Sequence, residues 1–154
     1  MKHEDQTADA TLEFLGGLWR LNHALEQLSA RMDARLGVTA QQRFVIRWIG
    51  KHPGIIAGQL ARILHLDAGT ISTTLARLEA KRLIERRRDQ RDRRRVTIVL
   101  TPAGTALDQA TGGTVESAVV ELCETRSAKD LGVTKQILEA LTRLLDAQSR
   151  SASG

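Results

Sequence analysis

Two short β-type runs separated by a cationic stretch occupy residues 83–100, and they constrain the fold more than any other part of the chain. In the second run, Val96, Ile98 and Leu100 are separated by single residues. Such alternation is typical of a strand with one buried face. We therefore expect an antiparallel β-hairpin within a chain whose remaining pattern is helical.

The stretch between the two runs concentrates positive charge. Residues 81–95 contain nine basic and three acidic residues, a net charge of +6, whereas the whole chain carries +5. The charge is therefore local, and the polyanion that such a hairpin suits best is the phosphate backbone of DNA. The arginines that we expect to contact DNA are Arg86, Arg88, Arg91, Arg93, Arg94 and Arg95.

Two acidic residues, Asp89 and Asp92, stand among these arginines at the expected tip of the hairpin. A loop with no task beyond nonspecific attraction would have no use for them, so we expect them to pair with neighbouring arginines and fix the direction of the others. An arginine held in this way can enter the minor groove, where narrow A·T-rich stretches attract cations. For any single arginine the alternative is a solvated surface charge.

A long amphipathic helix is predicted over residues 9–36, before a terminating Gly37. Its apolar residues are spaced alternately four and three apart: Phe14, Leu18, Leu21, Leu25, Leu28 and Met32. This spacing is the seam of a helix that packs along another helix. An ordinary core helix and a contact between two subunits explain the seam about equally well, although the length of the helix favours a partner.

Three shorter helices are predicted between this helix and the hairpin, over residues 39–52, 56–64 and 68–82, with Asp67 as the cap of the last. The side chains expected to face inward are Phe44, Val45, Trp48, Ile49, Leu60, Ile63, Leu64, Ile71, Leu75 and Leu78. Only three residues separate the last two helices, which is typical of a helix-turn-helix, and the hairpin would make it winged.

The outer face of helix 68–82 is polar and nearly free of large or acidic side chains. It carries Thr70, Ser72, Thr73, Thr74 and Arg77. Short hydrogen-bonding side chains suit a helix that enters the major groove of DNA. The alternative is a solvated face, for which Glu and Lys would be better helix formers. The pattern therefore favours a recognition helix.

Two further helices are predicted, one over residues 102–126 with Thr101 as its cap and a bend at Gly112–Gly113, and one over residues 131–148. The expected fold is mainly α with a small β-hairpin wing. Its parts are a winged helix-turn-helix lobe at residues 37–101, dimerisation helices at 9–36 and 102–148, and flexible tails at 1–8 and 149–154.

Two segments resemble the MarR family. Asp89–Arg94, followed by Val96, Leu100, Thr101 and Gly104, is similar to the family's wing signature. Leu66–Ser72, followed by Leu75 and Arg77–Glu79, is similar to its recognition helix. The order of elements agrees from about residue 10 to residue 148.

The resemblance implies a homodimeric winged-helix transcription regulator, usually a repressor that is released from its operator by a small ligand or by oxidation. By motif position it implies that Arg91 and Arg94 are wing arginines. It also implies that Thr70, Ser72 and Thr73 face the groove.

The start of the recognition helix also resembles the organic-hydroperoxide-sensing branch of that family, whose reactive cysteine lies in the first helix. Residues 9–36 contain no cysteine here, and the sole cysteine is Cys123, beside Leu122. We expect Cys123 to be a buried structural residue and not a redox sensor.

If an effector binds, it is expected to lie where the first, second and fifth helices meet. The candidates are Trp19, His23, Trp48 and His52, because two indoles and two imidazoles would suit a small aromatic or anionic compound. The alternative is that the tryptophans belong to the core and that the histidines are exposed or end helices.

The sequence predicts no enzyme and no cofactor. Its four histidines and one cysteine show no metal-ligand spacing, and it contains no Gly-rich phosphate loop and no nucleophile elbow. No signal peptide or membrane span is recognisable, so a cytoplasmic protein is expected. Two other functions stay open: a nonspecific architectural DNA-binding protein, and an interaction module whose hairpin binds an acidic partner.

Overall fold

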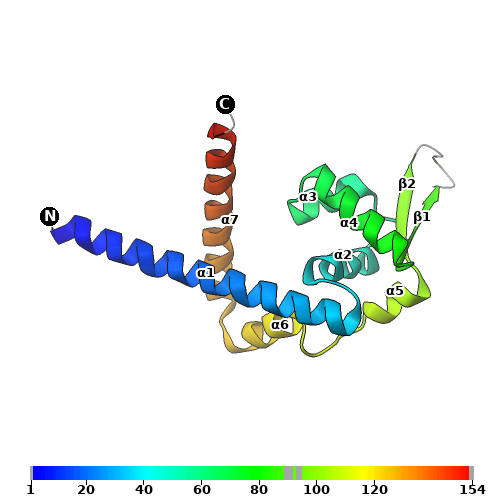
Figure 1. Ribbon diagram of the computed structural model, residues 1–154, viewed down its shortest axis with the longest axis horizontal. Coiled ribbons are helices and arrows are strands. Elements are labelled where there is room, and N and C mark those ends of the chain that lie inside the picture. Colours follow the sequence, from blue (N-terminus) through cyan, green and yellow to red (C-terminus); the bar gives the residue numbers. More distant parts are fainter. Residues whose placement is uncertain (1, 89–91, 93–94, 153–154) are drawn as a thin grey trace. The chain divides into compact units, whose positions relative to one another are not determined.

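The computed structural model describes residues 2–88, 92 and 95–152, with side chains from residue 8 onward. The described chain forms, in order, α1 (Lys2–Leu36), α2 (Ala40–Lys51), α3 (Ala57–Leu64), α4 (Ala68–Ala80), β1 (Ile84–Arg88), β2 (Val96–Leu100), α5 (Pro102–Leu107), α6 (Val115–Thr125) and α7 (Ala128–Ser151) (Figure 1). It divides into two compact units, one that ends at Val115 and one that begins at Glu116.

The first unit has a hydrophobic core enclosed by α2, α3, α4 and the hairpin. Apolar residues that recur three and four apart give each of these helices one buried face. The core consists of Val38, Val45, Ile46, Ile49, Ile55, Leu60, Ile71, Leu75, Leu78, Leu83, Ile84 and Ile98. The expected inward position is wrong for Phe44, which is 47% exposed, and for Ile63, which is 37% exposed. Both lie at the rim of surface hollows instead of in the core.

The predicted hairpin is confirmed. β1 and β2 are antiparallel, with Ile84 opposite Leu100 and Arg88 opposite Val96. The N–H of Ile98 also donates to the carbonyl oxygen of Ile55, at 2.8 Å. This bridge fixes the base of the hairpin to the connection between α2 and α3, so that the hairpin is part of the lobe.

Helix α1 is longer than expected. It begins at Lys2, so residues 2–8, expected as a flexible tail, are helical. No Gly or Pro interrupts the sequence before Gly16, and nothing local stops the helix. The other expected tail is also helical as far as Ser151, because α7 continues to that residue. Of the predicted α1 seam, Met32 is fully buried, whereas Phe14, Leu21 and Leu25 are exposed.

The expected helix over residues 102–126 is two helices and not one bent helix. Thr101 caps α5 as predicted, since its side chain accepts from the N–H of Gly104 at 3.1 Å. The chain leaves the helical path after Leu107 and resumes it at Val115. Gly113 has a φ of +67°, a conformation that only glycine adopts at no steric cost. Arginine side chains take up the carbonyl oxygens that a continuous helix would use internally.

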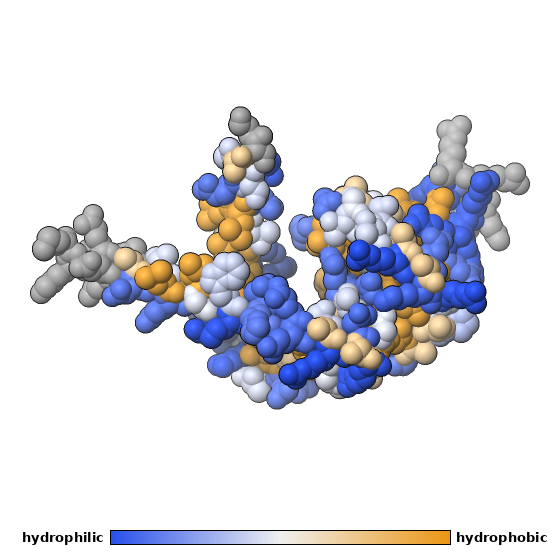
Figure 2. All heavy atoms as spheres, in the orientation of Figure 1, coloured by the Kyte–Doolittle hydropathy of each residue, from blue (hydrophilic) through white to orange (hydrophobic). Residues whose placement is uncertain are grey.

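The second unit consists of α6 and α7, and neither helix has a buried residue within the described chain. Figure 2 shows hydrophobic surface along α7. Cys123 of α6 is exposed, so the expected burial of this thiol is wrong for the single chain. Its apolar neighbour Leu122 suggested a place in the core, but Leu122 is itself 49% exposed.

Candidate nucleic-acid interface

Helix α4 has a well-defined N-terminus. The Asp67 carboxylate accepts from the backbone N–H of Thr70 at 2.9 Å and also from the Thr70 hydroxyl. These bonds, the hydroxyl first, lower the pKa of Asp67 below its ordinary value of 3.8. The predicted cap is confirmed, and it fixes where the polar face of α4 begins.

Most of the predicted groove-facing residues lie on the outer face of α4. Ser72, Thr73 and Arg77 are exposed, and Thr70 is half-buried. Thr74 is a correction, because it is only 6% exposed and its hydroxyl donates to the carbonyl oxygen of Thr70 at 2.8 Å. It lies one turn from both Ile71 and Leu78, and so belongs to the buried face of the helix.

The first strand of the hairpin holds its arginines in different ways. Arg86 is on the same face of β1 as the buried Ile84, and its Nε lies 3.1 Å from the carboxylate of Glu79 on α4. Arg87 is on the other face and pairs with Glu85 at 2.9 Å. Arg88 is exposed at the end of the strand. Arg86, expected to contact phosphate, therefore also joins the hairpin to the recognition helix.

A small hollow of about 100 Å³ shows that α3, α4 and the hairpin border one surface. Ser72 of α4 and Arg86 of β1 line it together with Ala57 and Gly58 at the start of α3. The start of α3 is not among the residues predicted to contact DNA. The sequence does contain an indication, because Ala57 and Gly58 are small residues at the start of a helix and leave its backbone accessible to a DNA phosphate.

The tip of the hairpin is described only in part. Asp89, Arg91, Arg93 and Arg94 lie outside the described residues. Asp92 and Arg95 are both exposed, and the N–H of Arg95 donates to the carbonyl oxygen of Asp92 at 2.9 Å. The expected ordering of the tip by acidic side chains therefore stays a prediction.

The four residues proposed for an effector do not line one cavity. Trp48 of α2 stacks on His52, which caps the C-terminus of that helix, with ring centroids 5.4 Å apart. Trp19 is 65% exposed on α1, and His23 bonds to Gln27 of the same helix. The first pair therefore lies at the C-terminal end of α2, and the second pair lies on α1.

A different hollow, of about 770 Å³, lies between α1 and α2. Its apolar lining consists of Leu25, Phe44, Leu64, Leu66 and Val115. Its polar lining includes Asn22 and Ser29, and the carboxylates of Glu26 and Asp33. Phe44, which is wrongly placed in the core by the sequence analysis, supplies an aromatic wall.

Among the described residues, no three His, Cys, Asp or Glu side chains are grouped closely enough to hold a metal ion. The helices of the described chain include none with the length and apolar character that crossing a membrane requires.

A short helix, a three-residue link, a capped helix with a polar outer face and a hairpin packed beside it define a winged helix-turn-helix protein. A profile of the MarR family matches residues 36–95. The organic hydroperoxide resistance transcriptional regulator of Bacillus subtilis (strain 168) is 30% identical over 112 residues, which are 73% of this chain and 73% of that protein. The chain belongs to the MarR family.

Solved structures of two regulators bound to DNA are similar to this chain. Streptococcus pneumoniae FabT in complex with DNA has a TM-score of 0.60 and 26% identity, over 88% of this chain and 94% of that one. The S. aureus MepR–DNA complex has a TM-score of 0.63 and 25% identity, over 86% of this chain and 96% of that one.

Proposed function

We propose that this MarR-type transcriptional regulator binds a pseudo-palindromic DNA operator as a homodimer and represses transcription from it. Each copy inserts the outer face of α4 into the major groove, while the hairpin contacts the backbone and the adjacent minor groove. The residues proposed to contact DNA are Thr70, Ser72, Thr73, Arg77, Arg86, Arg88, Arg91, Arg93, Arg94 and Arg95.

One observation carries this proposal. Ser72 of α4 and Arg86 of the hairpin border the same hollow, so the polar helix and the cationic hairpin can meet one duplex at the same time. Figure 1 shows α4 and β1 beside each other, as the ion pair between Glu79 and Arg86 requires. The DNA complexes of FabT and MepR support the same use of a similar fold.

Selection of binding sites from random duplex DNA tests the proposal. We expect enrichment of a pseudo-palindrome whose half-sites lie about 10 bp apart, centre to centre. Equal affinity for every duplex would instead indicate an architectural protein. Little duplex binding even at low salt would indicate a module that binds an acidic protein.

Variants assign the two surfaces. Ser72→Ala and Thr73→Ala should change which bases are selected, whereas Arg91→Ala and Arg94→Ala should weaken binding to all selected sites. The matched control is Arg31→Ala, an exposed arginine on α1 that should change neither. A base preference that survives in both α4 variants would remove that helix from the proposed readout.

Small-molecule control is a second proposal, and the hollow between α1 and α2 favours it. The apolar wall suits an aromatic compound, but Glu26 and Asp33 in the lining disfavour an anion. A neutral or cationic aromatic effector is therefore the better match for this hollow. Phe44→Ala should abolish release of DNA by such a compound while operator affinity without the compound is retained.

Oxidative control through a cysteine of the first helix, which the resemblance to the organic-hydroperoxide-sensing branch implies, would need another site here. Helix α1 contains no cysteine, and the sole thiol of the chain is Cys123. We propose a regulator that acts in the cytoplasm by binding and not by catalysis. Operator binding that is unchanged by hydroperoxide is the expected result.

A further inference from the structure

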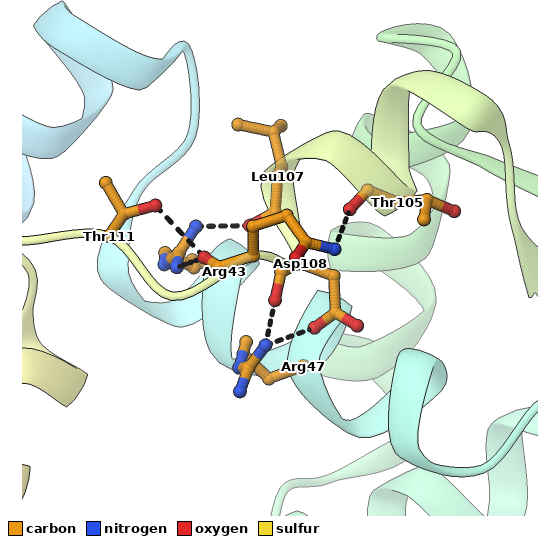
Figure 3. Close-up of polar contacts among 7 residues, drawn as sticks. Arg43, Arg47, Thr105, Leu107, Asp108 and Thr111 are labelled. Carbon is orange, nitrogen blue, oxygen red and sulfur yellow. Dashed lines mark hydrogen bonds and ion pairs between the residues drawn. The ribbon is translucent and has the colours of Figure 1, made fainter.

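Two arginines of α2 hold the end of α5 (Figure 3). Arg43 is 1% exposed, and its terminal nitrogens donate to the carbonyl oxygens of Leu107 and Gln109, the latter at 2.7 Å. Arg47 donates to the carbonyl oxygen of Asp108 and pairs with its carboxylate at 2.8 Å. The backbone just after α5 is therefore attached to the winged-helix lobe through guanidinium groups.

A third arginine holds the other end of the same segment. Arg35 lies in the last turn of α1, and its Nη2 donates to the carbonyl oxygens of Gly112 and Gly113, at 2.8 and 2.9 Å. Residues 107–113 are thus held by α2 at one end and by α1 at the other. We call Arg35, Arg43 and Arg47 the arginine clasp.

Two glycines, Gly50 and Gly113, leave the space that the contacts of the arginine clasp occupy. A side chain at Gly50 would overlap the carboxylate of Asp108. A Cβ at Gly113, where φ is +67°, would lie only 3.0 Å from the guanidinium of Arg35. Arginine suits this task because it stays charged and presents several donors in a fixed plane, so that one side chain can bind two carbonyl oxygens.

A lysine joins α1 to the recognition helix directly. Lys81 follows α4, and its Nζ lies 2.6 Å from the carbonyl oxygen of Gly37 and 3.6 Å from the carboxylate of Asp33 on α1. It also donates to the side chain of Gln42 at 3.1 Å. The first unit therefore contains two sets of polar contacts between α1 and the lobe that carries α4.

These contacts fix the helix with the uncovered apolar seam relative to the helix with the groove-facing residues. We propose that the arginine clasp and Lys81 are positioning residues that set the distance between the two recognition helices of the dimer, and so the half-site spacing that the dimer accepts. The inference depends on the proposed function, because it concerns how two copies read one operator.

The physical reason is symmetry. A change in the angle between α1 and the lobe occurs in both copies, so it moves both recognition helices. Each added base pair shifts a half-site by about 3.4 Å along the duplex and rotates it about the axis. A rigid dimer therefore accepts one spacing, whereas a dimer with a loosened connection accepts several with lower affinity for the best one.

The experiment measures the affinity of the full-length chain for the selected operator with spacings from two base pairs shorter to two longer. The variant is Arg35→Ala/Arg47→Ala, because both side chains are partly exposed and the fold should tolerate their loss. Lys81→Met is a second variant at the separate contact, and Arg31→Ala is the control. Sedimentation and circular dichroism establish that each protein is dimeric and folded.

We expect the native protein and the control to lose affinity by about 30-fold or more when the spacing changes by two base pairs. In both test variants that loss should fall to about 5-fold or less, with a weaker optimum. If the variants lose affinity equally at every spacing, the side chains have only a structural role, and the proposal is overturned. A dependence of affinity on spacing that is the same as in the native protein also overturns it. If the native protein itself shows no spacing preference, the proposed function is contradicted. That result is distinguishable from failure of this inference, because it does not involve the variants.

Discussion

The winged-helix lobe and the terminal helices use the same apolar residue types in opposite ways. In the lobe, Ile46, Leu60 and Leu75 are fully buried within one chain. On α7, Leu144 is 64% exposed and Leu145 is 58% exposed. The comparison teaches that the lobe has a core of its own, whereas the terminal helices leave their apolar side chains uncovered within one chain, and we expect a second copy to cover them.

The energies of burial agree with this division. Full burial of one Leu or Ile side chain contributes about 1.5–3 kcal/mol. In a two-fold symmetric dimer each such residue is buried in both copies, so its contribution counts two times. The apolar residues of the terminal helices that are exposed in the single chain are Phe14, Leu21 and Leu25 on α1, Val119 and Leu122 on α6, and Val133, Ile137, Leu144 and Leu145 on α7.

The sharpest way to break the comparison is to place charge on α7. Ile137→Asp/Leu144→Asp adds four carboxylates to a dimer interface, so we expect the dimer Kd to rise about 1,000-fold or more and operator binding to be lost. Sedimentation velocity measures the first effect and a gel shift the second. Arg143→Asp, on the exposed polar side of the same helix, is the control. A double variant that remains dimeric would show that α7 is not part of the interface.

A core substitution sharpens the comparison from the other side. Leu75→Ala should lower the free energy of unfolding by about 2–5 kcal/mol, because it leaves a cavity in the lobe. That loss should not depend on protein concentration. Leu144→Ala should lower the melting temperature only at concentrations where the native protein is a dimer. Thermal unfolding across a hundredfold range of concentration distinguishes them, and an equal effect of Leu144→Ala at all concentrations would contradict the division.

The lobe was largely predictable because its signals are local. Apolar spacing placed Ile71, Leu75 and Leu78 on the buried face of α4, and alternation placed the hairpin. The caps at Asp67 and Thr101 follow from the short range of a side-chain bond to a helix N–H. Each of these features is decided within a few residues of sequence.

The errors arose where distant residues decide the outcome. The break between α5 and α6 depends on arginines from α1 and α2 that lie more than 60 residues away in sequence. The error at Thr74 is of another kind, because the spacing of Ile71 and Leu78 is local and already turns Thr74 towards the buried face. The burial expected for Cys123 is wrong because an apolar neighbour in the sequence does not determine whether another element covers the thiol, which is exposed in the described chain.

A smaller effect is expected at the surface of the lobe, where the proposed contacts are with DNA and not with a second copy. Arg88→Ala should weaken operator binding about 3- to 10-fold and reduce the slope of log affinity against log salt by about 0.9, the value for one phosphate. Arg87→Ala is the matched control, because Arg87 already pairs with Glu85. Both variants should stay dimeric. An unchanged salt slope for Arg88→Ala would remove the strand from the backbone contacts.

The smallest effect concerns the pH dependence of the lobe alone. Hydrogen bonds from Thr70 hold the pKa of Asp67 below 3.8, so the carboxylate stabilises the folded state above that pH, and the contribution is lost as the pH falls through the lowered pKa. Asp67→Ala should therefore lower the melting temperature by about 2–4 °C at neutral pH. The difference from the native protein should shrink below pH 3.8. Asp146→Ala on the exposed face of α7 is the control, and it should leave the lobe transition unchanged. If the difference for Asp67→Ala persists at the lowest pH, the contribution of the Asp67 cap does not depend on the charge of its carboxylate. The stability of the lobe would then come from packing and uncharged hydrogen bonds alone.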